Sequence, residues 1–355
     1  MEKKTTVLQV GPLPPPIGGI SIFLDHLRKV DSGEVSHEFF NIFPNKNTKL
    51  NKAIYNIVVY FKFLFVLLKV KPEIIHVHTA AYRSFWKNTG IIYISKLFNK
   101  KVVMHLHSGH FSDFYEKNSD RNKRIITKVL HTCDKLICLS SGWKEYYTKT
   151  FDLDSNRIEV VTNAIFVDDY ISPNKSRTPD LNILYIGSLT ENKGLKDLVE
   201  IAKELKNKYN SNYKFTVIGN GPLYNYIKDE KQKHSLNIEL CGELSGNEKT
   251  REFKNADVLF LPSYFEGMPL CILEGLAAGH VIISTNVGAI PEVVKESENG
   301  YLYQPGDVEK AVRIIMDLNK DKVDEISKKN VRYAQESYDF QQLAKKLDLI
   351  YLSIL

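Results

Sequence analysis

Two acidic residues in the C-terminal half, Glu266 and Glu274, are eight positions apart and could bind the same ligand. Glu266 lies in a Gly/Pro-containing loop, whereas Glu274 lies inside a helix expected to begin near Pro269, because proline suits the first turn of a helix. Free N–H groups at the helix start would attract phosphates, while the carboxylates accept hydrogen bonds from sugar hydroxyls. This spacing alone is common by chance, so its interpretation depends on the neighbouring motifs.

A second candidate is the loop at residues 187–194, which follows a strand-like run and opens a helix. Its Lys193 is placed where a cation can neutralise the charge that develops on a departing diphosphate. Two further turns, 219–222 and 286–292, also follow strand-like runs. All of these turns come at the carboxyl ends of strands, where open α/β sheets bind ligands.

Short β-branched runs alternate with longer helical patterns along the chain, which predicts an α/β protein with parallel sheets built from βαβ units. Its 355 residues suffice for two domains, and residues 167–180, rich in turn residues, are the expected linker. The predicted strands are 7–10, 37–43, 73–79, 101–107, 135–140 and 158–162, then 182–186, 214–218, 238–240, 258–261 and 281–284.

The second half closely resembles the large retaining glycosyltransferase family of the GT-B fold, family 4, most densely over residues 182–306. The resemblance implies two Rossmann-like parallel-sheet domains that face each other across a cleft. An acceptor-binding domain at 1–170 would precede a donor-binding domain at 181–339, and a closing helix at 340–355 would cross back to the first domain. The implied reaction is metal-independent, retaining sugar transfer without a cofactor, of the kind found in bacterial surface-polysaccharide assembly.

Site roles follow from the same resemblance. Glu274 would hold the ribose hydroxyls of the nucleotide, and Glu266 would hold the hydroxyls of the donor sugar. Lys193 would bind the diphosphate, assisted by backbone amides near Met268–Leu270, with Pro269 at the helix start. Gly219, in the turn after a neighbouring strand, is also expected to border the donor.

The first half contributes a glycine loop at residues 11–19, which resembles the loop that approaches the donor phosphates. Gly18 and Gly19 would let the backbone come close to the ligand at the start of the next helix. One position departs from the family pattern, because Ser188 stands where an Arg usually follows the glycine of the Lys193 loop. Either Lys193 and helix dipoles suffice there, or another basic residue replaces the missing cation.

Eight of the ten histidines lie in the first half, which raises the alternative of a zinc site. His76 with His78, and His105 with His107, alternate along strands, so each pair shares one sheet face without a Cys or carboxylate at ligand spacing. We therefore expect no metal there. By resemblance, His107 matches the cleft histidine that contacts the donor sugar, with His110 as the alternative.

Two other groups of residues are of types that can bind metal ions. Asp152 and Asp154 have the D-x-D form used by metal-dependent transferases of another fold, but no strand leads into them, so we predict a solvated turn. The cysteines are scattered and are expected to be reduced and mostly buried thiols of a cytoplasmic protein. They are Cys133, Cys138, Cys241 and Cys271.

Charge is unevenly distributed, since residues 1–180 carry 26 basic and 17 acidic side chains and the remainder carries 22 and 25. A basic first half favours an anionic partner, with lysine used simply for solubility as the alternative. The apolar segment 53–70 is short for a membrane-spanning helix. It is interpreted either as a crossover helix packed on the sheet, which its position favours, or as a helix that also offers Phe61, Phe63 and Phe65 to a membrane interface.

Three other classes of function compete with the transferase. A nucleotide-sugar epimerase of the same double fold is the alternative to the transferase, although Lys193, Glu266 and Glu274 fit the transferase better. A nicotinamide dehydrogenase is disfavoured because the first glycine loop is not G-x-G-x-x-G, and a non-catalytic polysaccharide-binding protein would not need a diphosphate site. We expect a UDP-sugar donor, a saccharide or lipid-linked acceptor, peripheral contact with the cytoplasmic face of the membrane, and no nucleic-acid partner.

Overall fold

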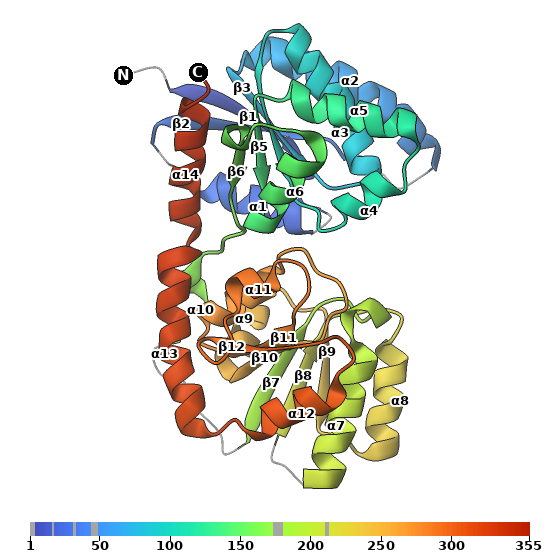
Figure 1. The fold of residues 1–355 in the computed structure, drawn as a ribbon, viewed down its shortest axis with the longest axis vertical. Coiled ribbons are helices and arrows are strands. Elements are labelled where there is room, and N and C mark those ends of the chain that lie inside the picture. Colours follow the sequence, from blue (N-terminus) through green and yellow to red (C-terminus); the bar gives the residue numbers. More distant parts are fainter. Residues whose placement is uncertain (1–3, 16–17, 31–32, 44–48, 173–179, 210–212) are drawn as a thin grey trace. The chain divides into compact units, whose positions relative to one another are not determined.

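The computed structural model describes residues 4–15, 18–30, 33–43, 49–172, 180–209 and 213–355, apart from the side chains of 49–56 and 208–209. The chain divides into two compact units, Met1–Ala164 with Phe340–Leu355, and Ile165–Asp339 (Figure 1). Each unit contains one six-stranded sheet in which all described pairings are parallel. The predicted α/β architecture is therefore confirmed.

The first sheet has the strand order β2-β1-β3-β4-β5-β6. The chain adds β2 on one side of β1 and then β3 to β6 on its other side, so the order of the strands changes direction between β1 and β3. The loops after β1 and β3 therefore leave the sheet at a topological switch point, where ligands bind in open α/β folds. The strands are β1 (Thr5–Gly11), β2 (Val35–Asn41), β3 (Ile74–Thr79), β4 (Lys101–Leu106), β5 (Lys135–Cys138) and β6 (Ile158–Val160). The helices are α1 (Gly19–Lys29), α2 (Lys49–Val70), α3 (Arg83–Leu97), α4 (Phe111–Glu116), α5 (Asp120–Thr132), α6 (Ser141–Phe151), the 3-10 turn η1 (Ser155–Arg157) and α14 (Phe340–Leu352).

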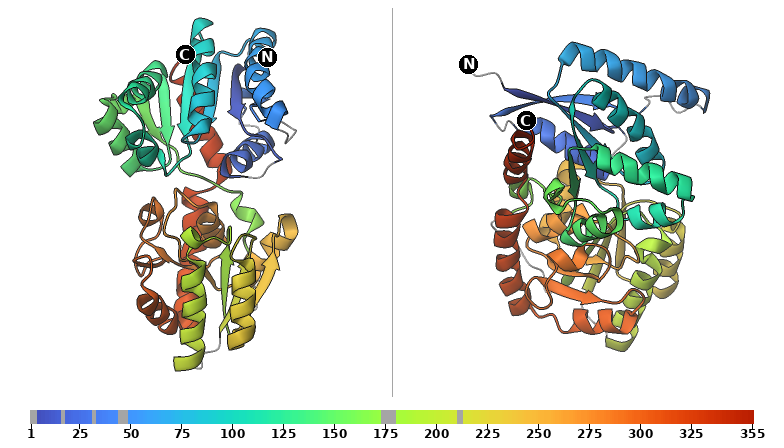
Figure 2. Two further views of the ribbon diagram at one scale, coloured as in Figure 1. Left: turned by 90° about the vertical axis from the view of Figure 1, so that its right-hand side faces the viewer. Right: turned by 45° about the horizontal axis from the view of Figure 1, so that its top comes forward.

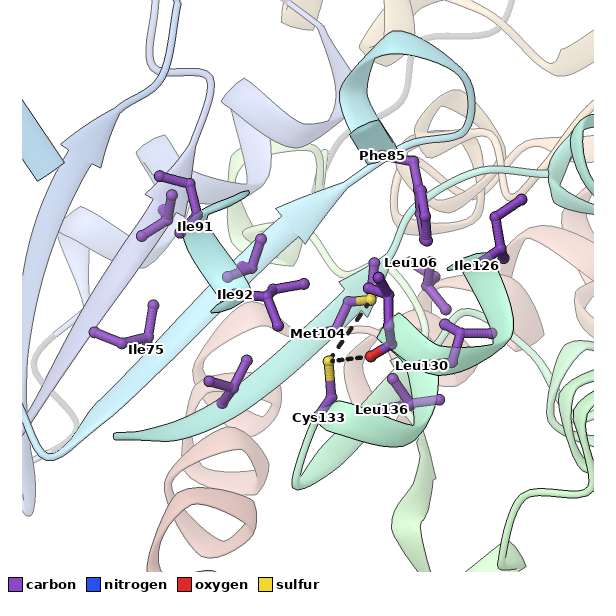
Figure 3. Packing of buried hydrophobic residues seen from close by; sticks show 14 of the residues in the cluster. Ile75, Phe85, Ile91, Ile92, Met104, Leu106, Ile126, Leu130, Cys133 and Leu136 are labelled. Atoms are coloured by element: carbon purple, nitrogen blue, oxygen red, sulfur yellow. Dashed lines mark hydrogen bonds between the residues drawn. The ribbon is translucent and has the colours of Figure 1, made fainter. Parts of the chain in front are cut away.

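One face of this sheet carries a continuous apolar core beneath α2, α3, α5 and α6. Figure 3 shows part of it, where Met104 of β4 packs among apolar side chains of α3 and α5. Cys133 lies in this core with its Sγ 4.0 Å from Met104 Sδ, and burial raises the pKa of its thiol to about 12. All four cysteines are free, as predicted, but Cys241 and Cys271 are only half-buried.

The other face of the first sheet is covered by α1 and α14, so the last helix belongs to the first unit, as predicted. The ring of Phe340 packs edge-on against Phe23 of α1, with ring centroids 5.4 Å apart. Tyr351 is fully buried, and its hydroxyl lies 2.7 Å from His76 Nδ1.

The helix α2 is a crossover helix between β2 and β3, in agreement with the interpretation that its position favoured. Its inward residues Val59, Phe63 and Leu67 are buried, whereas Phe61 and Phe65 are exposed. The expectation that Phe63 could reach a membrane is therefore wrong, because its ring fills the core and packs against Phe40. Among the described residues, no helix combines the length and the apolar character needed to cross a bilayer.

The second sheet has the order β12-β11-β10-β7-β8-β9, and its switch point lies between β7 and β10. Helices α7, α8 and α12 pack together, while α10 packs against α13 (Figure 1). The strands are β7 (Leu181–Ile186), β8 (Tyr213–Ile218), β9 (Ile238–Gly242), β10 (Val258–Leu261), β11 (Val281–Thr285) and β12 (Gly300–Tyr303). The helices are η2 (Val167–Asp169), η3 (Glu191–Lys193), α7 (Leu195–Tyr209), α8 (Tyr224–His234), α9 (Gly246–Asn255), α10 (Leu270–Ala277), α11 (Ile290–Val293), α12 (Val308–Met316) and α13 (Lys320–Ser337).

Short polar residues begin the last helices of the second unit. Asp307 caps α12 by accepting a hydrogen bond from the Lys310 amide at 3.0 Å, and Asn319 caps α13 by accepting one from the Lys322 amide at 2.9 Å. Such side chains satisfy amides that lack partners inside the helix, so they fix where it begins.

Two sequence-based boundaries require correction. The second unit begins at Ile165, so residues 165–170, assigned above to the first domain, pack with the second. The cause is visible at Ile165, whose amide donates to Tyr338 O at 3.0 Å. The expected linker contains the turn η2, and its residues 173–179 lie outside the described residues.

Candidate functional site

The loops that follow β7 and β10 lie against each other on either side of the switch point of the second sheet. Gly194 ends the β7 loop with φ of 69°, and a Cβ there would lie 1.9 Å from Pro262 O. Only glycine permits both this conformation and this close approach. The Tyr264 amide also donates to Asn192 O at 2.9 Å. These contacts hold Lys193 beside the loop that carries Glu266.

Lys193 and Glu266 form an ion pair, with 2.6 Å between Nζ and Oε1. The same carboxylate oxygen accepts a hydrogen bond from the buried Ser263 hydroxyl at 2.7 Å. Glu266 is 9% exposed, so the pair lies at the boundary between protein and solvent. The structure thus brings the predicted cation and the predicted sugar-binding carboxylate into direct contact.

Glu274 lies in α10 and is 6% exposed. Its Oε1 accepts hydrogen bonds from Lys249 Nζ of α9 at 2.6 Å and from the Tyr170 hydroxyl at 2.7 Å. Neither partner was singled out from the sequence. Tyr170 stood in the expected linker, and Lys249 belongs to a polar helix without a recognisable motif, so only tertiary structure connects them to Glu274.

Both motif carboxylates accept through Oε1, and no bond to either Oε2 is found among the described residues. Each carboxylate is therefore held in orientation by two donors while one oxygen can still accept from a ligand. Two such acceptors near one helix start suit a ligand that has several hydroxyl groups and a phosphate.

The side chains of Cys271 and Tyr170, which neighbour the two carboxylates, are held in their protonated forms. Burial, with added effects of the Glu266 and Glu274 charges, raises the pKa of Cys271 to about 12. Burial and the neighbouring Glu274 charge also raise the pKa of Tyr170 far above its ordinary value. Both groups therefore stay protonated at neutral pH, and the Tyr170 hydroxyl remains a hydrogen-bond donor.

The remaining predicted donor-site residues lie at the same edge of the second sheet. Ser188 is exposed directly after β7. Gly219 follows β8, and a Cβ there would lie 1.9 Å from the carbonyl oxygen of Gly187. Pro269 is the N-cap of α10, which begins at Leu270.

Met268, the other predicted residue at this helix start, precedes Pro269 and is buried. The start of α10 therefore follows the β10 loop directly, with the positive end of its dipole at the sheet edge.

In the first unit, Gly18 is the N-cap of α1, and its amide donates to the Ser21 hydroxyl at 2.7 Å. A Cβ at Gly19 would meet no atom within 4 Å, so the space beside it is open. Pro16 and Ile17 of the same loop lie outside the described residues. Both glycines are at the start of a helix that leaves the switch point of this sheet.

His107 follows β4 and is held by three neighbours. Its amide donates to Thr79 O at 2.8 Å, its Nε2 lies 3.0 Å from His78 Nδ1, and its ring stacks on His105 with centroids 3.8 Å apart. Burial lowers the pKa of His107 to about 3, although the side chain keeps some contact with solvent. His107 is therefore a neutral imidazole at physiological pH. His110 is exposed and occupies the N-cap position of the short helix α4.

A chain of hydrogen bonds assigns the tautomer of His107. His78 Nε2 lies 2.8 Å from the carbonyl oxygen Oε1 of Gln9, so it carries the proton and leaves Nδ1 as an acceptor. His107 must then donate from Nε2 to His78, which leaves His107 Nδ1 as an acceptor. Gln9 in turn donates to the Tyr351 hydroxyl at 3.1 Å, which ties the chain to α14.

The other histidines in this group differ in how fully their ring nitrogens are hydrogen-bonded. His76 and His78 are buried and hydrogen-bonded, whereas both ring nitrogens of buried His105 lack a partner among the described residues. Ligand atoms of His76, His78 and His105 lie within 4.8 Å of one another. Both nitrogens of His78 are already bonded, and no carboxylate or thiol joins this group in the described part of the chain, so it offers a poor set of metal ligands.

The D-x-D pair lies in a turn, as predicted. Asp152 ends α6 in the left-handed conformation, and Asp154 begins η1 by accepting a hydrogen bond from the Asn156 amide at 2.9 Å. Both residues therefore belong to the turn between α6 and β6, Asp152 through its backbone and Asp154 through its carboxylate.

Comparison with known proteins gives matches along most of the chain. Residues 26–169 match the model of glycosyltransferase family 4, and residues 167–339 match the model of glycosyl transferases group 1. An uncharacterised glycosyltransferase of Methanocaldococcus jannaschii is 29% identical over 220 residues, which cover 60% of this chain and only 59% of that protein.

Two further matches extend over more of the chain. A UDP-Gal:alpha-D-GlcNAc-diphosphoundecaprenol alpha-1,3-galactosyltransferase of Escherichia coli is 26% identical over 307 residues, which cover 81% of this chain and 76% of that enzyme. The crystal structure of Anabaena HepE in complex with UDP is 15% identical and covers 99% of this chain and 100% of its own, with a TM-score of 0.76. The structural likeness shows a shared fold.

Proposed function

Because the chain belongs to the GT-B glycosyltransferases that join a family 4 domain to a group 1 domain, we propose that it transfers a sugar from a nucleotide diphosphate to an acceptor, with retention of anomeric configuration. A UDP-sugar is the proposed donor, and a saccharide or lipid-linked saccharide of surface-polysaccharide assembly is the proposed acceptor. The acceptor class rests on the relative whose name includes a diphosphoundecaprenol-linked sugar.

The ion pair between Lys193 and Glu266 is the observation that supports this proposal most strongly. It places a cation and a hydroxyl acceptor side by side, as a sugar joined to a diphosphate requires. Glu274, whose Oε2 can accept from a ligand, would bind the ribose. Ser188, Gly219 and the start of α10 would border the same donor.

In the proposed reaction, the acceptor hydroxyl attacks the anomeric carbon on the face from which the nucleotide leaves. A new bond forms between that hydroxyl oxygen and the anomeric carbon, while the bond from carbon to phosphate oxygen breaks. The acceptor proton passes to the departing phosphate oxygen. Lys193 would stabilise charge on the diphosphate, and Glu266 would orient the sugar.

Roles for the first unit are parts of the same proposal. His107, neutral and with Nδ1 as an acceptor, would receive a hydrogen bond from a donor-sugar hydroxyl without acting as an obligatory base. Gly18 and Gly19 would let the backbone approach the phosphates. We further propose that the reaction takes place in the cytoplasm and needs neither a metal ion nor another cofactor, because Lys193 and helix N-termini would replace a divalent cation.

A donor screen tests the proposed function. The protein is incubated with individual UDP-, GDP- and ADP-sugars together with a mixture of saccharide and lipid-linked acceptors, and released nucleoside diphosphate is measured. We expect release from one donor, dependent on acceptor, without binding of NAD(H). NAD(H) binding accompanied by interconversion of two nucleotide sugars, without diphosphate release, would instead establish the epimerase alternative.

A further inference from the structure

The outward face of α2 is apolar. Ile57, Phe61, Phe65 and Leu68 are exposed by 64%, 69%, 67% and 54%, respectively. Their spacing of four, four and three positions places them along one side of a helix. We call these four residues the outer stripe. Isolated apolar residues are ordinary on protein surfaces, but a continuous row of this kind marks an interaction site.

A second exposed apolar group lies at the end of α3, where Leu97 is 80% exposed and Phe98 is 41% exposed. The helices α2 and α3 pack side by side, and the Tyr60 hydroxyl donates to Lys87 O at 3.0 Å. Each helix ends just before a strand, α2 before β3 and α3 before β4, so both ends lie at the amino-terminal edge of the sheet (Figure 2). The end of the outer stripe at Leu68 therefore lies at the same edge of the first unit as Leu97 and Phe98.

The surrounding sequence is strongly basic. Residues 39–112 contain eleven Lys and Arg and a single acidic residue, Glu73. The Glu73 carboxylate accepts a hydrogen bond from the Thr6 amide at 2.9 Å, so it is engaged within the fold. Lys69 and Lys71 are exposed at the end of α2 next to Leu68, and Lys101 is exposed beyond Phe98.

We propose that this side of the first unit binds a lipid bilayer with anionic headgroups. The outer stripe would enter the boundary between headgroups and acyl chains, with α2 parallel to the membrane plane. The lysines at the helix ends would contact lipid phosphates. Apolar burial and attraction to anionic lipid act together in interfacial helices of this kind.

The positive charge of this surface favours a bilayer over a second copy of the chain as its binding partner. A symmetric dimer through the outer stripe would bring two copies of the same basic surface together, and like charges across an interface oppose association. An anionic membrane supplies the missing negative charge and an apolar layer at once. The proposal concerns lipid binding alone, so it does not depend on the proposed sugar transfer.

Vesicle flotation of the full chain, without donor or acceptor, tests the proposal. Vesicles of equimolar phosphatidylcholine and phosphatidylglycerol are compared with vesicles of phosphatidylcholine alone. The variant Phe61→Ser/Phe65→Ser changes two exposed side chains and is expected to fold, as circular dichroism and thermal melting would show. The matched control is Leu349→Ser, because Leu349 is 68% exposed on α14, away from this surface.

We expect the wild-type chain and the Leu349→Ser control to float with the anionic vesicles and to be released as salt is raised. The Phe61→Ser/Phe65→Ser variant should bind at least about tenfold more weakly, because two buried aromatic side chains are lost. Three results would overturn the proposal: equal binding by the variant, equal binding to neutral vesicles, or a dimer that the double substitution dissociates while no vesicle binding is seen.

Discussion

Lys193 and Glu266 are bonded to each other at 2.6 Å across the switch point of the second sheet, although they are far apart in the sequence. In the free protein, each side chain neutralises the other, and the Ser263 hydroxyl adds a second bond to the same carboxylate oxygen. The pair is therefore in position before a ligand arrives. A ligand that carries both a diphosphate and a hydroxylated sugar could bind Lys193 through the diphosphate and Glu266 through the sugar.

Replacing Lys193 with Met should weaken the binding of UDP more than the binding of UMP. The ammonium group is expected to contact the diphosphate, and a bond to a charged group contributes about 1.5–3 kcal/mol. Isothermal titration of both nucleotides measures the difference. An equal loss of affinity for UDP and UMP would show that Lys193 supports the site without contacting the diphosphate.

Glu274→Gln should weaken UDP binding by about tenfold to a hundredfold, because the ribose hydroxyls lose a charged acceptor. The matched control is Glu325→Gln, which removes an exposed carboxylate on α13 and its ion pair with Lys329. UDP affinity equal to that of the wild type in the Glu274 variant would reject its assignment to the ribose.

Glu266→Gln should impair turnover by about a hundredfold while UDP affinity stays within about threefold of the wild-type value. Free UDP lacks the donor sugar that Glu266 is proposed to bind, and loss of the carboxylate leaves Lys193 without its competing anion. Turnover is measured with saturating donor and affinity with UDP alone. A parallel loss of both would mean that the roles of the two carboxylates have been confused.

The strands that the sequence predicted contain short runs of apolar residues with Val, Ile or Phe, whereas β12 (Gly300–Tyr303) escaped notice because its sequence, Gly-Tyr-Leu-Tyr, begins with glycine and has no β-branched residue. The positions of the loops in the second unit could be predicted because their tight turns require glycine, as at Gly194. Lys249 and Tyr170 could not, because their contacts with Glu274 depend on packing between elements distant in sequence. Likewise, the sequence alone did not show how α2 is rotated about its axis, and this rotation buries Phe63 and exposes Phe61.

The buried histidines should make the first unit sensitive to acid. Burial, together with the charges of neighbouring histidines, lowers the pKa of His76, His78 and His105 well below the ordinary value in the folded state. The unfolded chain therefore binds more protons once the pH falls below about 6.5. Each histidine then removes roughly 1.4 kcal/mol of stability per pH unit, until its folded pKa is reached.

Urea unfolding between about pH 7.5 and about pH 5 measures this effect. Both tryptophans of the chain, Trp86 and Trp143, lie in the first unit, so their fluorescence reports on that unit. His105→Leu removes one titrating group without breaking a hydrogen bond and should make the decline less steep, and His110→Asn, at an exposed position, is the control substitution. Identical pH dependence in the His105 variant and the wild type would contradict this explanation.

Retaining, metal-independent sugar transfer is tested most directly by proton NMR of the reaction in EDTA, with the donor identified by the screen and its acceptor. We predict that the anomeric signal of an α-linked nucleotide sugar declines while an α-linked product and free nucleoside diphosphate appear at the same rate. Omitting the chelator should not change that rate. A first-formed β-linked product, or activity that EDTA abolishes and manganese or magnesium restores, would contradict it.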